Sequence, residues 1–440
     1  MPSVGESIPR TDAALKVTGA ARFVDDIVID GMWHGAIVGA NVARGRVKSI
    51  ELDRTFDWGH VVTADASDIP GKNCVAMIKD DLPLIVEKGI RHAGEAILLI
   101  AAPTRDLALE ARRRVKVEYE ELSPLLTIED SKKARTKIFG NDNVVASCEI
   151  KKGDVDAALA RADIVVEGTY ETGLQEHTYI EPQGMIAEWK HGGSLSVVGS
   201  LQCPYYVSNA MSVLMDIPEE RISVRQAEVG GAFGGKEDYP SILAGYCAVL
   251  SRKCGHPVKI VYDRDEDIRV TTKRHPSRVF HRTGVKKDGT LVAMDILFEL
   301  DAGAYVTLTP VVLSRGALHS PGPYRCPNVR VRAAAYATNT PPNGAFRGFG
   351  APQAIFPVEV HMDRVAEAAR LSPLEFRKKN CLKKGDTTAT GQRLTESVAT
   401  LRVLDEAVKR SKFEKRAKEL DQPVWTVGEV RAGQGIEVLS

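Results

Sequence analysis

The sequence predicts an α+β protein built from two or three domains, and three observations lead to this fold class. The chain has 440 residues, of which 43% are hydrophobic, which is enough to fill more than one buried core. Short runs rich in β-forming residues occur in turn with helical patterns along most of the chain, which predicts both sheets and helices. One polar and charged segment, residues 129–147, interrupts this alternation and is the best candidate for a linker between domains.

Composition and charge argue against several classes of partner. Lysine and arginine total 59 and aspartate and glutamate 58, so the formal net charge is only +1. Such a balance does not favour binding to nucleic acid or to a membrane surface. The longest apolar runs, such as "EAILLIAA" (95–102), are too short to cross a bilayer, and the opening stretch "MPSVGESIPRTDAALK" lacks the apolar centre of a signal peptide. We therefore expect a cytoplasmic protein without a nucleic-acid or membrane partner.

The cysteines show no pattern of disulfide or metal sites. They form no C-x-x-C pair, and their number, seven, is odd. The spacing therefore predicts neither a disulfide framework nor a cysteine-ligated zinc or iron–sulfur site within this chain. Most are expected to be buried, reduced thiols; they are Cys74, Cys148, Cys203, Cys247, Cys254, Cys326 and Cys381.

Residues 17–125 are expected to form a compact α/β unit. The runs at 32–40 and 95–103 are typical of buried strands, and residues 104–122 begin as a helix, with Thr104 as its N-cap, and end as a strand. No cluster of reactive side chains occurs in this unit. Its histidines are isolated, and a lone histidine is more often a packed or surface residue than a ligand; they are His34, His60 and His92.

Beyond residue 147, strands and helices alternate again. Asp288-Gly289 is a strong turn signal between two β-rich runs and predicts a hairpin within residues 284–305. A helix over residues 240–255 has apolar residues on one face and is expected to end at Gly255. The other expected elements are strands at 163–172, 221–231, 256–267 and 330–340, a loop at 341–353 and a helix at 354–371.

The C-terminal part of the chain is helical and charged after Gly391. Its final stretch, residues 425–440, resembles the beginning of a strand rather than the end of a domain. We therefore expect a continuation that this sequence lacks.

Two glycine-rich loops share one pattern. "GGAFGGKED" (230–238) follows one expected strand, "GAFRGFGAPQ" (344–353) follows another, and a helix is expected after each. Both contain Ala-Phe, nearby glycines and an embedded charged residue. Glycine at such a junction lets the backbone approach a ligand closely, and free N–H groups at the start of a helix favour anions or electronegative oxygens.

The first loop almost matches a phosphate-binding P-loop. Gly230, Gly235 and Lys236 fill the required positions, but Glu237 stands where a serine or threonine would bind Mg²⁺. A carboxylate there repels phosphate, and no second acidic motif follows a strand to hold the metal, so a nucleotide site is disfavoured. A pair of purely structural turns remains open on these residues alone, although it does not explain why the same loop occurs twice.

Taken together, the two loops and the stretches around them resemble the molybdenum-binding subunit of the xanthine dehydrogenase and aldehyde oxidase family. The likeness extends from about residue 8 to residue 410, and the order of the motifs makes it specific. The supporting stretches are "VTGAARFVDDI" (17–27), "GLQEHTYIEPQ" (173–183), "YDRDEDI" (262–268), "KRHPS" (273–277) and "ATNTPPNGAFRGFG" (337–350).

The resemblance implies an N-terminal α/β hammerhead domain (residues 1–135) followed by the first molybdenum-cofactor-binding domain (136–390). Residues 391–440 would then be a helical tail leading toward a second cofactor-binding domain that this chain lacks. The implied cofactor is molybdopterin, which inserts water-derived oxygen at a carbon next to nitrogen or oxygen; a bacterial source would favour its cytosine dinucleotide form. Electrons would leave through [2Fe-2S] clusters and FAD on partner chains.

Motif matching carries several cofactor and substrate contacts over from the family. Gln202 would hydrogen-bond at the molybdenum, and the Phe233-Gly234 step and the backbone of Arg347 would lie against the cofactor. Phe349 would pack on a flat aromatic substrate. The family's molybdenum is held by the pterin and takes no direct protein ligand, which fits a sequence without a His/Cys cluster.

Glu237 and Arg315 match the substrate-facing pair of the purine-oxidising members. A carboxylate and a guanidinium beside a ring could hydrogen-bond its nitrogens and stabilise developing charge. We therefore expect an N-heteroaromatic substrate, such as a purine or a nicotinate-like ring. Four alternatives remain: an ion pair that these two side chains form with each other or with a neighbour, aldehyde oxidation, reduction of an aromatic acyl-CoA, and a non-catalytic scaffold. Carbon monoxide oxidation is disfavoured, because residues 346–350 lack the family's copper-holding cysteine.

The chain departs from the family in one respect. The family's general base is a glutamate in the second cofactor-binding domain, and no residue here matches it; the "AGQGIE" stretch (432–437) is taken as a chance likeness. The chain is therefore expected to be the larger piece of a split molybdenum subunit, as in certain bacterial nicotinate dehydrogenases, with a truncated chain as the alternative. The expected partners are a second molybdenum-binding subunit carrying that base, an iron–sulfur subunit and an FAD subunit.

Overall fold

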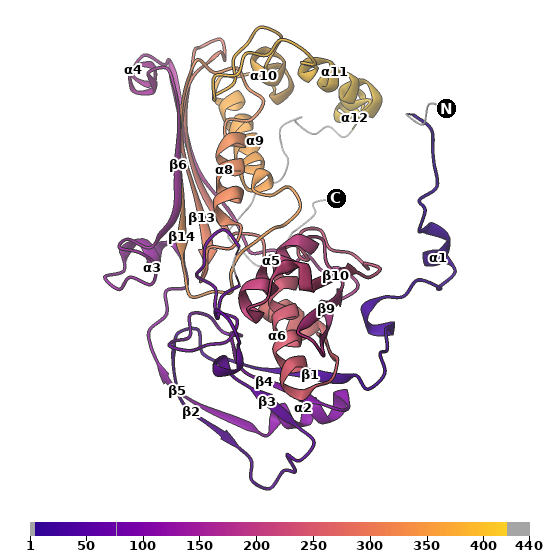
Figure 1. Cartoon of the computed structure of the whole chain (residues 1–440). Helices are drawn as coiled ribbons and strands as arrows, with labels where there is room; N and C mark the ends of the chain where they lie inside the picture. The colour runs from indigo at the N-terminus through magenta and orange to yellow at the C-terminus, as the bar shows by residue number, and fades with distance from the viewer. Residues whose placement is uncertain (1–4, 76, 420–440) are drawn as a thin grey trace.

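The computed structural model describes residues 5–75 and 77–419 (Figure 1). Within them the chain forms two large sheets and a separate two-stranded ribbon, with helices packed against the sheets. The expected mixture of helices and sheets is confirmed. The strand expected to begin at 425–440 lies outside the described residues.

The larger sheet lies in the lower half of the molecule as drawn in Figure 1 and mixes parallel and antiparallel pairs. Its seven strands are, in spatial order, β10 (Ile222–Gln226), β9 (Ser194–Gly199), β8 (Gly184–Lys190), β11 (Val258–Val261), β1 (Trp33–Gly39), β4 (Ala96–Ala102) and β3 (Val62–Ala64). The strands β1 and β4 confirm the two that the sequence predicts near the N-terminus, and β4 is buried throughout.

Strands β1, β3 and β4 of the N-terminal segment belong to the main sheet. Strand β1 pairs in parallel with β11, with Trp33 opposite Val258, and antiparallel with β4. Strands that are far apart in the sequence therefore share one core, and the compact unit expected for residues 17–125 is built into the main sheet of the following segment. Only the ribbon of β2 (Gly45–Leu52) and β5 (Val115–Glu121) belongs to the N-terminal segment alone.

Helix α6 (Tyr239–Cys254) packs on this sheet beside α5 (Pro204–Met215) and is buried along most of its length. It begins where the first glycine loop ends, so burial of the helix fixes one end of the loop. The side chain of Asp238 accepts a hydrogen bond from the backbone of the first turn. Gly255 ends the helix with a φ of 75°, a left-handed conformation that glycine adopts without strain, as the sequence predicts.

The second sheet has five strands and lies in the upper half of Figure 1. Its spatial order is β6 (Val144–Lys152), β14 (Asn328–Ala337), β13 (Leu291–Gly303), β12 (Ser277–Val285) and β7 (Ile164–Thr172). Two of the helices that pack on it, α8 (Thr309–His319) and α9 (Ala351–Ala368), contact each other and share its apolar core. Strands β12 and β13 form the expected hairpin, with Gly289 in its turn at a φ of 80°.

Two sequence predictions need correction. Residues 129–147 are only partly a linker, because α3 (Ile128–Lys133) occupies their beginning and β6 takes in their end through its ladder with β14. Residues 256–267 are not one strand. They form β11 and then enter α7 (Arg264–Val270), because the side chain of Asp263 caps a helix at that point.

The other helices are shorter or lie at the edges of the molecule. They are α1 (Ala13–Val17), α2 (Arg105–Arg113), α4 (Val155–Ala160), α10 (Pro373–Asn380), α11 (Thr400–Ser411) and α12 (Phe413–Glu419). Thr104 caps α2, as the sequence predicts, since its hydroxyl accepts a hydrogen bond from the Leu107 amide at 3.3 Å. In the part of the chain that the structure describes, no helix is both long and apolar enough to span a lipid bilayer.

Candidate active site

The two glycine loops touch each other. The Arg347 amide of the second loop donates a hydrogen bond to the Phe233 carbonyl of the first, with an N···O distance of 2.9 Å. Gly234 packs so closely under the second loop that an added Cβ would lie 2.9 Å from the carbonyl carbon and oxygen of Ala345. Its φ of 100° is also one that glycine alone adopts readily. Two segments far apart in the sequence thus form one structural unit.

An open groove of about 450 Å³ lies along this contact. The groove includes every residue that the sequence analysis assigned to the site, together with Phe346 and Gly348. The assigned residues are Gln202, Phe233, Gly234, Glu237, Arg315, Arg347 and Phe349. They come from the start of α5, the two loops and α8, so the fold gathers four separate segments around one opening.

Gln202 precedes α5 and presents a free donor to the groove. Its Oε1 accepts hydrogen bonds from the amides of Gly234 at 2.9 Å and Lys236 at 3.4 Å. The backbone amide of Gln202 donates to the Lys236 carbonyl at 2.7 Å, which fixes the residue against the first loop. With Oε1 engaged, the side-chain NH₂ has no partner among the described residues and is available to a ligand.

Both loops hold an aromatic residue in a conformation that is uncommon outside glycine. Phe233 has a φ of 54° and Phe349 a φ of 49°. Such a backbone costs on the order of 1–3 kcal/mol and persists where neighbouring contacts determine it. Here the cross-loop hydrogen bond to the Phe233 carbonyl and the 2.7 Å bond from the Phe349 amide to Phe346 supply those contacts. The strain places both rings on the groove wall.

Glu237 and Arg315 line the same groove and pair neither with each other nor with a neighbour. Among the described residues, no ion pair or side-chain hydrogen bond involves either of them, which removes that alternative for this structure. Arg315 is exposed on α8, and Glu237 is half-buried at the end of the first loop. Burial raises the pKa of the Glu237 carboxyl, and the neighbouring carboxylate of Asp238 raises it further. Both side chains are therefore free to meet a ligand.

Lys236 points away from the groove and holds the first loop from within. It is fully buried, and its Nζ donates to Glu181 Oε2 at 2.9 Å, to the Glu181 carbonyl at 2.8 Å and to Ser200 Oγ at 2.8 Å. The ammonium also lies 4.7 Å from the centroid of the Tyr179 ring. A lysine engaged in this way cannot reach a phosphate in the groove, so the likeness to a P-loop is a coincidence of spacing.

His177 and Arg274, which are both buried, hold the second loop through the Phe346 ring and through backbone carbonyls. The ring of Phe346 lies between them, with the His177 ring stacked at 4.2 Å and the Arg274 guanidinium 3.8 Å from its centroid. His177 Nε2 lies 2.8 Å from the Ala345 carbonyl, and Arg274 Nη2 donates to the Arg347 carbonyl at 3.0 Å. Both residues lie in stretches that carry the family resemblance, 173–183 and 273–277, but the sequence gave neither residue a role, because no local pattern ties a single histidine or arginine to a distant loop.

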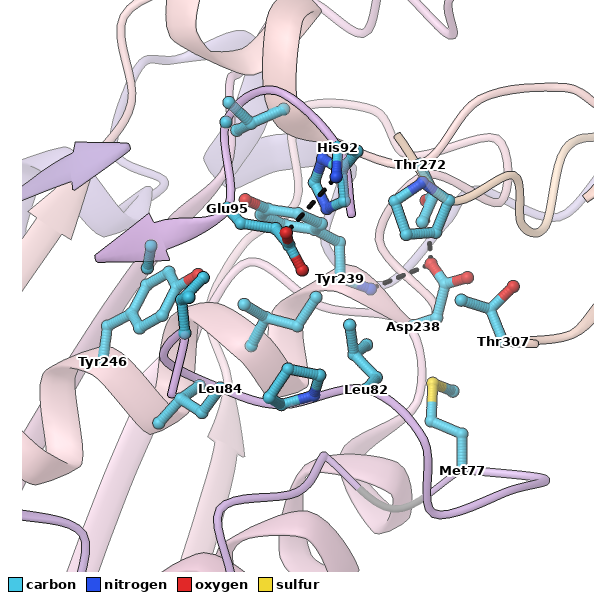
Figure 2. Close-up of a pocket in the computed structure, with 17 residues that line it drawn as sticks. Met77, Leu82, Leu84, His92, Glu95, Asp238, Tyr239, Tyr246, Thr272 and Thr307 are labelled. Carbon is cyan, nitrogen blue, oxygen red and sulfur yellow. Dashed lines mark hydrogen bonds between the residues drawn. The ribbon is translucent and has the colours of Figure 1, made fainter. Parts of the chain in front are cut away.

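A second, smaller pocket lies beside the end of the first loop (Figure 2). Its volume is about 30 Å³, room for one or two water molecules. Glu95 and His92 of the N-terminal segment line it together with Asp238 at the end of the first loop and Tyr239 at the start of α6. It shares no lining residue with the groove, so we place the candidate site in the groove.

The chemistry of the groove fits an anionic, oxygen-rich group such as molybdopterin. It offers the Gln202 NH₂, the guanidinium groups of Arg315 and Arg347, and the Gly348 amide, which donates to no described acceptor. Only one carboxylate, that of Glu237, faces these donors. Backbone and side-chain donors in a glycine cradle are suited to anions and electronegative atoms. Among residues 5–75 and 77–419, no three histidine, cysteine or acidic side chains converge to ligate a metal directly.

Comparison with known families agrees with this geometry. The family described as the molybdopterin cofactor-binding domain matches residues 138–381. The aldehyde oxidase and xanthine dehydrogenase a/b hammerhead domain matches residues 18–123. The expected order of a hammerhead domain followed by a cofactor-binding domain is confirmed, whereas the domain boundaries drawn from the sequence remain predictions.

Two curated relatives align over 92% of the chain. It is 37% identical over 407 residues to the nicotinate dehydrogenase large molybdopterin subunit of Eubacterium barkeri, covering 95% of that protein. It is 33% identical over 411 residues to a probable xanthine dehydrogenase subunit of Bacillus subtilis, of which it spans only 54%. The chain thus matches one relative over nearly its whole length and another over about half.

Solved structures show the same fold. The aldehyde oxidoreductase of Desulfovibrio gigas superposes with a TM-score of 0.86 at 29% identity, covering 94% of this chain and 47% of that one. The quinoline 2-oxidoreductase of Pseudomonas putida 86 superposes with a TM-score of 0.85 at 27% identity, covering 96% of this chain and 56% of that one. Sequence identity over almost the full length, both family matches and the fold together show that the chain belongs to the xanthine dehydrogenase family of molybdenum-dependent oxidoreductases, as a molybdopterin-binding subunit.

Proposed function

We propose that this chain forms the cofactor and substrate wall of a molybdenum hydroxylase that oxidises an N-heteroaromatic ring, such as a purine or a nicotinate-like compound. The observation that carries the proposal is the unpaired Glu237 and Arg315 beside the exposed Phe233 ring and the partly buried Phe349 ring in one groove. A half-buried carboxylate of purely structural use is usually engaged with a donor, and Glu237 is not, so it is free to meet a ligand beside Arg315.

The groove residues suit a planar, polar ring. Phe349 and Phe233 present apolar faces against which such a ring can stack. Arg315 can donate to a ring nitrogen or exocyclic oxygen and stabilise negative charge that develops during attack. Glu237, with its raised pKa, holds a proton to a higher pH than an ordinary glutamate and can donate or accept at a ring nitrogen.

The cofactor contacts are proposed for Gln202, Phe233, Gly234 and Arg347. Gln202 would direct its free NH₂ toward the bound group, while the glycine step and the Arg347 backbone would allow close approach. When bound, molybdopterin, which we propose in its cytosine dinucleotide form, would supply oxygen transfer and two-electron redox chemistry. Electrons would pass to [2Fe-2S] and FAD groups on partner chains.

A second molybdenum-binding chain is proposed to cover the groove and to supply the general base. The surfaces beside the groove expose large apolar side chains, which a partner would bury: Tyr205 on α5, Val311 and Leu318 on α8, and Ile355 and Phe356 on α9. The solved relatives carry about as much chain again as this one, consistent with a missing half of the site. An iron–sulfur subunit and an FAD subunit would complete a cytoplasmic assembly.

Aldehyde oxidation is the second candidate, because the aldehyde oxidoreductase of Desulfovibrio gigas superposes as well as the quinoline enzyme does. The Glu237–Arg315 pair favours the heteroaromatic substrate, since an aldehyde carbonyl offers no ring nitrogen to a carboxyl group. The rate of ring oxidation should depend on Glu237, whereas the rate of aldehyde oxidation should not.

Native purification tests the proposal most directly. We expect the chain to co-purify with further subunits and to carry molybdenum and several iron atoms per assembly. The assembly should oxidise nicotinate-like or purine rings faster than aromatic aldehydes, and Glu237→Gln should lower kcat/KM for rings by tenfold or more while sparing aldehydes. A folded native assembly without either metal would overturn the proposal, and a preference for aldehydes that ignores Glu237→Gln would favour the second candidate.

A further inference from the structure

Arg274 is a buried cation without a carboxylate partner. Only 7% of its surface is exposed, and no acidic side chain among the described residues forms an ion pair with it. Arginine is rarely buried to this degree unless an anion accompanies it, because an isolated charge loses its hydration. Its neighbour in the sequence, Lys273, is equally buried and does have a partner, with Glu176 Oε2 at 2.6 Å.

The contacts of Arg274 are all with neutral groups. Its Nε donates to Gln175 Oε1 at 2.5 Å, its Nη2 to the Arg347 carbonyl at 3.0 Å, and its Nη1 reaches Gln353 Oε1 at 3.5 Å. The face of the guanidinium lies on the Phe346 ring. These contacts engage three of its five N–H donors and leave a full positive charge in a region of low dielectric.

This charge lies directly behind the groove wall. Phe346 and Arg347, which Arg274 contacts, both line the groove. An anionic group in the groove would therefore be separated from the guanidinium by a single layer of protein. Attraction across such a layer is strong, because little water intervenes to screen it.

We propose that Arg274 is a positioning residue whose unpaired charge is balanced by the anionic cofactor bound in the groove, and that its bond to the Arg347 carbonyl holds the second loop against that cofactor. This inference rests on the proposed function, since it requires an anionic redox group in the groove. A positive charge at this place strengthens retention of the anionic group and favours the uptake of electrons by the bound molybdenum, which makes its midpoint potential more positive.

Gln175→Glu tests the charge without removing the arginine. The substitution places a carboxylate where Oε1 already accepts from Arg274 Nε, so it supplies the missing partner with little change of shape. We expect the cofactor-free chain to melt at a higher temperature, whereas the native assembly should bind molybdopterin less tightly and show a more negative molybdenum midpoint potential. If Arg274 has only a structural role, the melting temperature should rise while cofactor binding and the midpoint potential stay unchanged.

Two variants at Arg274 complete the test. Arg274→Lys keeps the charge and should keep the potential near the wild-type value, while Arg274→Gln should shift it in the same direction as Gln175→Glu. Arg282→Gln, which removes an exposed arginine paired with Glu167, is the matched control and should leave the potential unchanged. If Arg274→Gln fails to fold, Gln175→Glu still decides.

The outcomes separate the two proposals. Molybdenum present in the assembly, with potential and molybdenum content unchanged in Gln175→Glu, would overturn the role of Arg274 and leave the proposed function intact. A native assembly that contains no molybdenum would overturn the proposed function and this inference with it. Redox titration and metal counting supply both readouts independently of turnover.

Discussion

The two glycine loops look alike in sequence, yet they are held in opposite ways. In the first loop the cation, Lys236, turns inward and is fully buried on Glu181 and Ser200. In the second, the side chain of Arg347 is exposed, and its backbone carbonyl accepts a hydrogen bond from the buried Arg274. A shared motif therefore specifies the backbone path of a loop, while the use of its charged residue depends on what the surrounding strands place behind it.

Lys236→Met should give the largest loss of stability among the substitutions that compare the two loops. Removing the ammonium leaves Glu181 without its cation, and loss of one partner from a buried ion pair costs about 3–5 kcal/mol. Denaturant unfolding of the purified chain measures this loss. Arg347→Met is the matched change in the other loop, and because that side chain is exposed it should alter stability by no more than about 0.5 kcal/mol. Equal losses in the two variants would contradict the difference between the loops.

Gly234→Ala should be the next most damaging change. The new methyl group would lie 2.9 Å from the Ala345 carbonyl, and the φ of 100° adds strain, so we expect a loss of about 3 kcal/mol and separation of the loops. Gly391→Ala is the control, since Gly391 has a similar φ of 88° but no atom within 4 Å of an added Cβ. It should cost about 1 kcal/mol from backbone strain alone. Melting temperatures that fall equally would show that the contact between loops adds nothing.

His177→Phe should lower the stability of the chain more modestly, because it weakens the contacts that hold the second loop. The phenyl ring keeps the stack on Phe346 but loses the hydrogen bond with the Ala345 carbonyl, which is worth about 1–2 kcal/mol at a buried site. His256→Phe serves as the control, because His256 stacks on Trp33 and its ring makes no hydrogen bond to any residue that the structure describes. Its stability should remain close to that of the unaltered chain. A comparable loss in both variants would assign the effect to stacking.

The smallest effect concerns pH. Burial raises the pKa of Glu237 above its ordinary value of 4.5, so the folded chain keeps a proton that the unfolded chain has lost. The carboxyl therefore reduces stability as pH rises from 4.5 through its folded pKa, and the reduction is absent at lower pH. Glu237→Gln should raise the free energy of unfolding near neutral pH by less than about 1 kcal/mol, because solvent screens the half-buried group. Thermal melts across pH check this, and a difference that grows toward acid pH would contradict it.

Local signals in the sequence predicted the parts of the fold that depend on nearby residues. The Asp288-Gly289 turn, the Thr104 cap and the Gly255 helix end each rest on chemistry within a few positions, and the structure has all three. The groove could be anticipated because two loops carried the same aromatic–glycine pattern. The parallel pairing of Trp33 with Val258 could not, because a strand's own residues do not name its partner.

The supports behind the site were also beyond reach of the sequence. Lys236 sits in a motif that usually points a lysine at phosphate, and only its bonds to Glu181 and Ser200 show that it turns the other way. His177 and Arg274 lie in separate segments and act on the second loop through space. Such residues carry no spacing rule, so their roles emerge only once the strands are assembled.

The parallel pairing of β1 with β11 has a consequence for biosynthesis. As the chain leaves the ribosome, β1 emerges long before the strand that completes its hydrogen-bond ladder, so its edge stays unprotected during much of translation. Cutting the gene between the two family domains would leave each product with an open sheet edge prone to aggregate. The cofactor-binding half should therefore be produced together with the first hundred or so residues rather than alone.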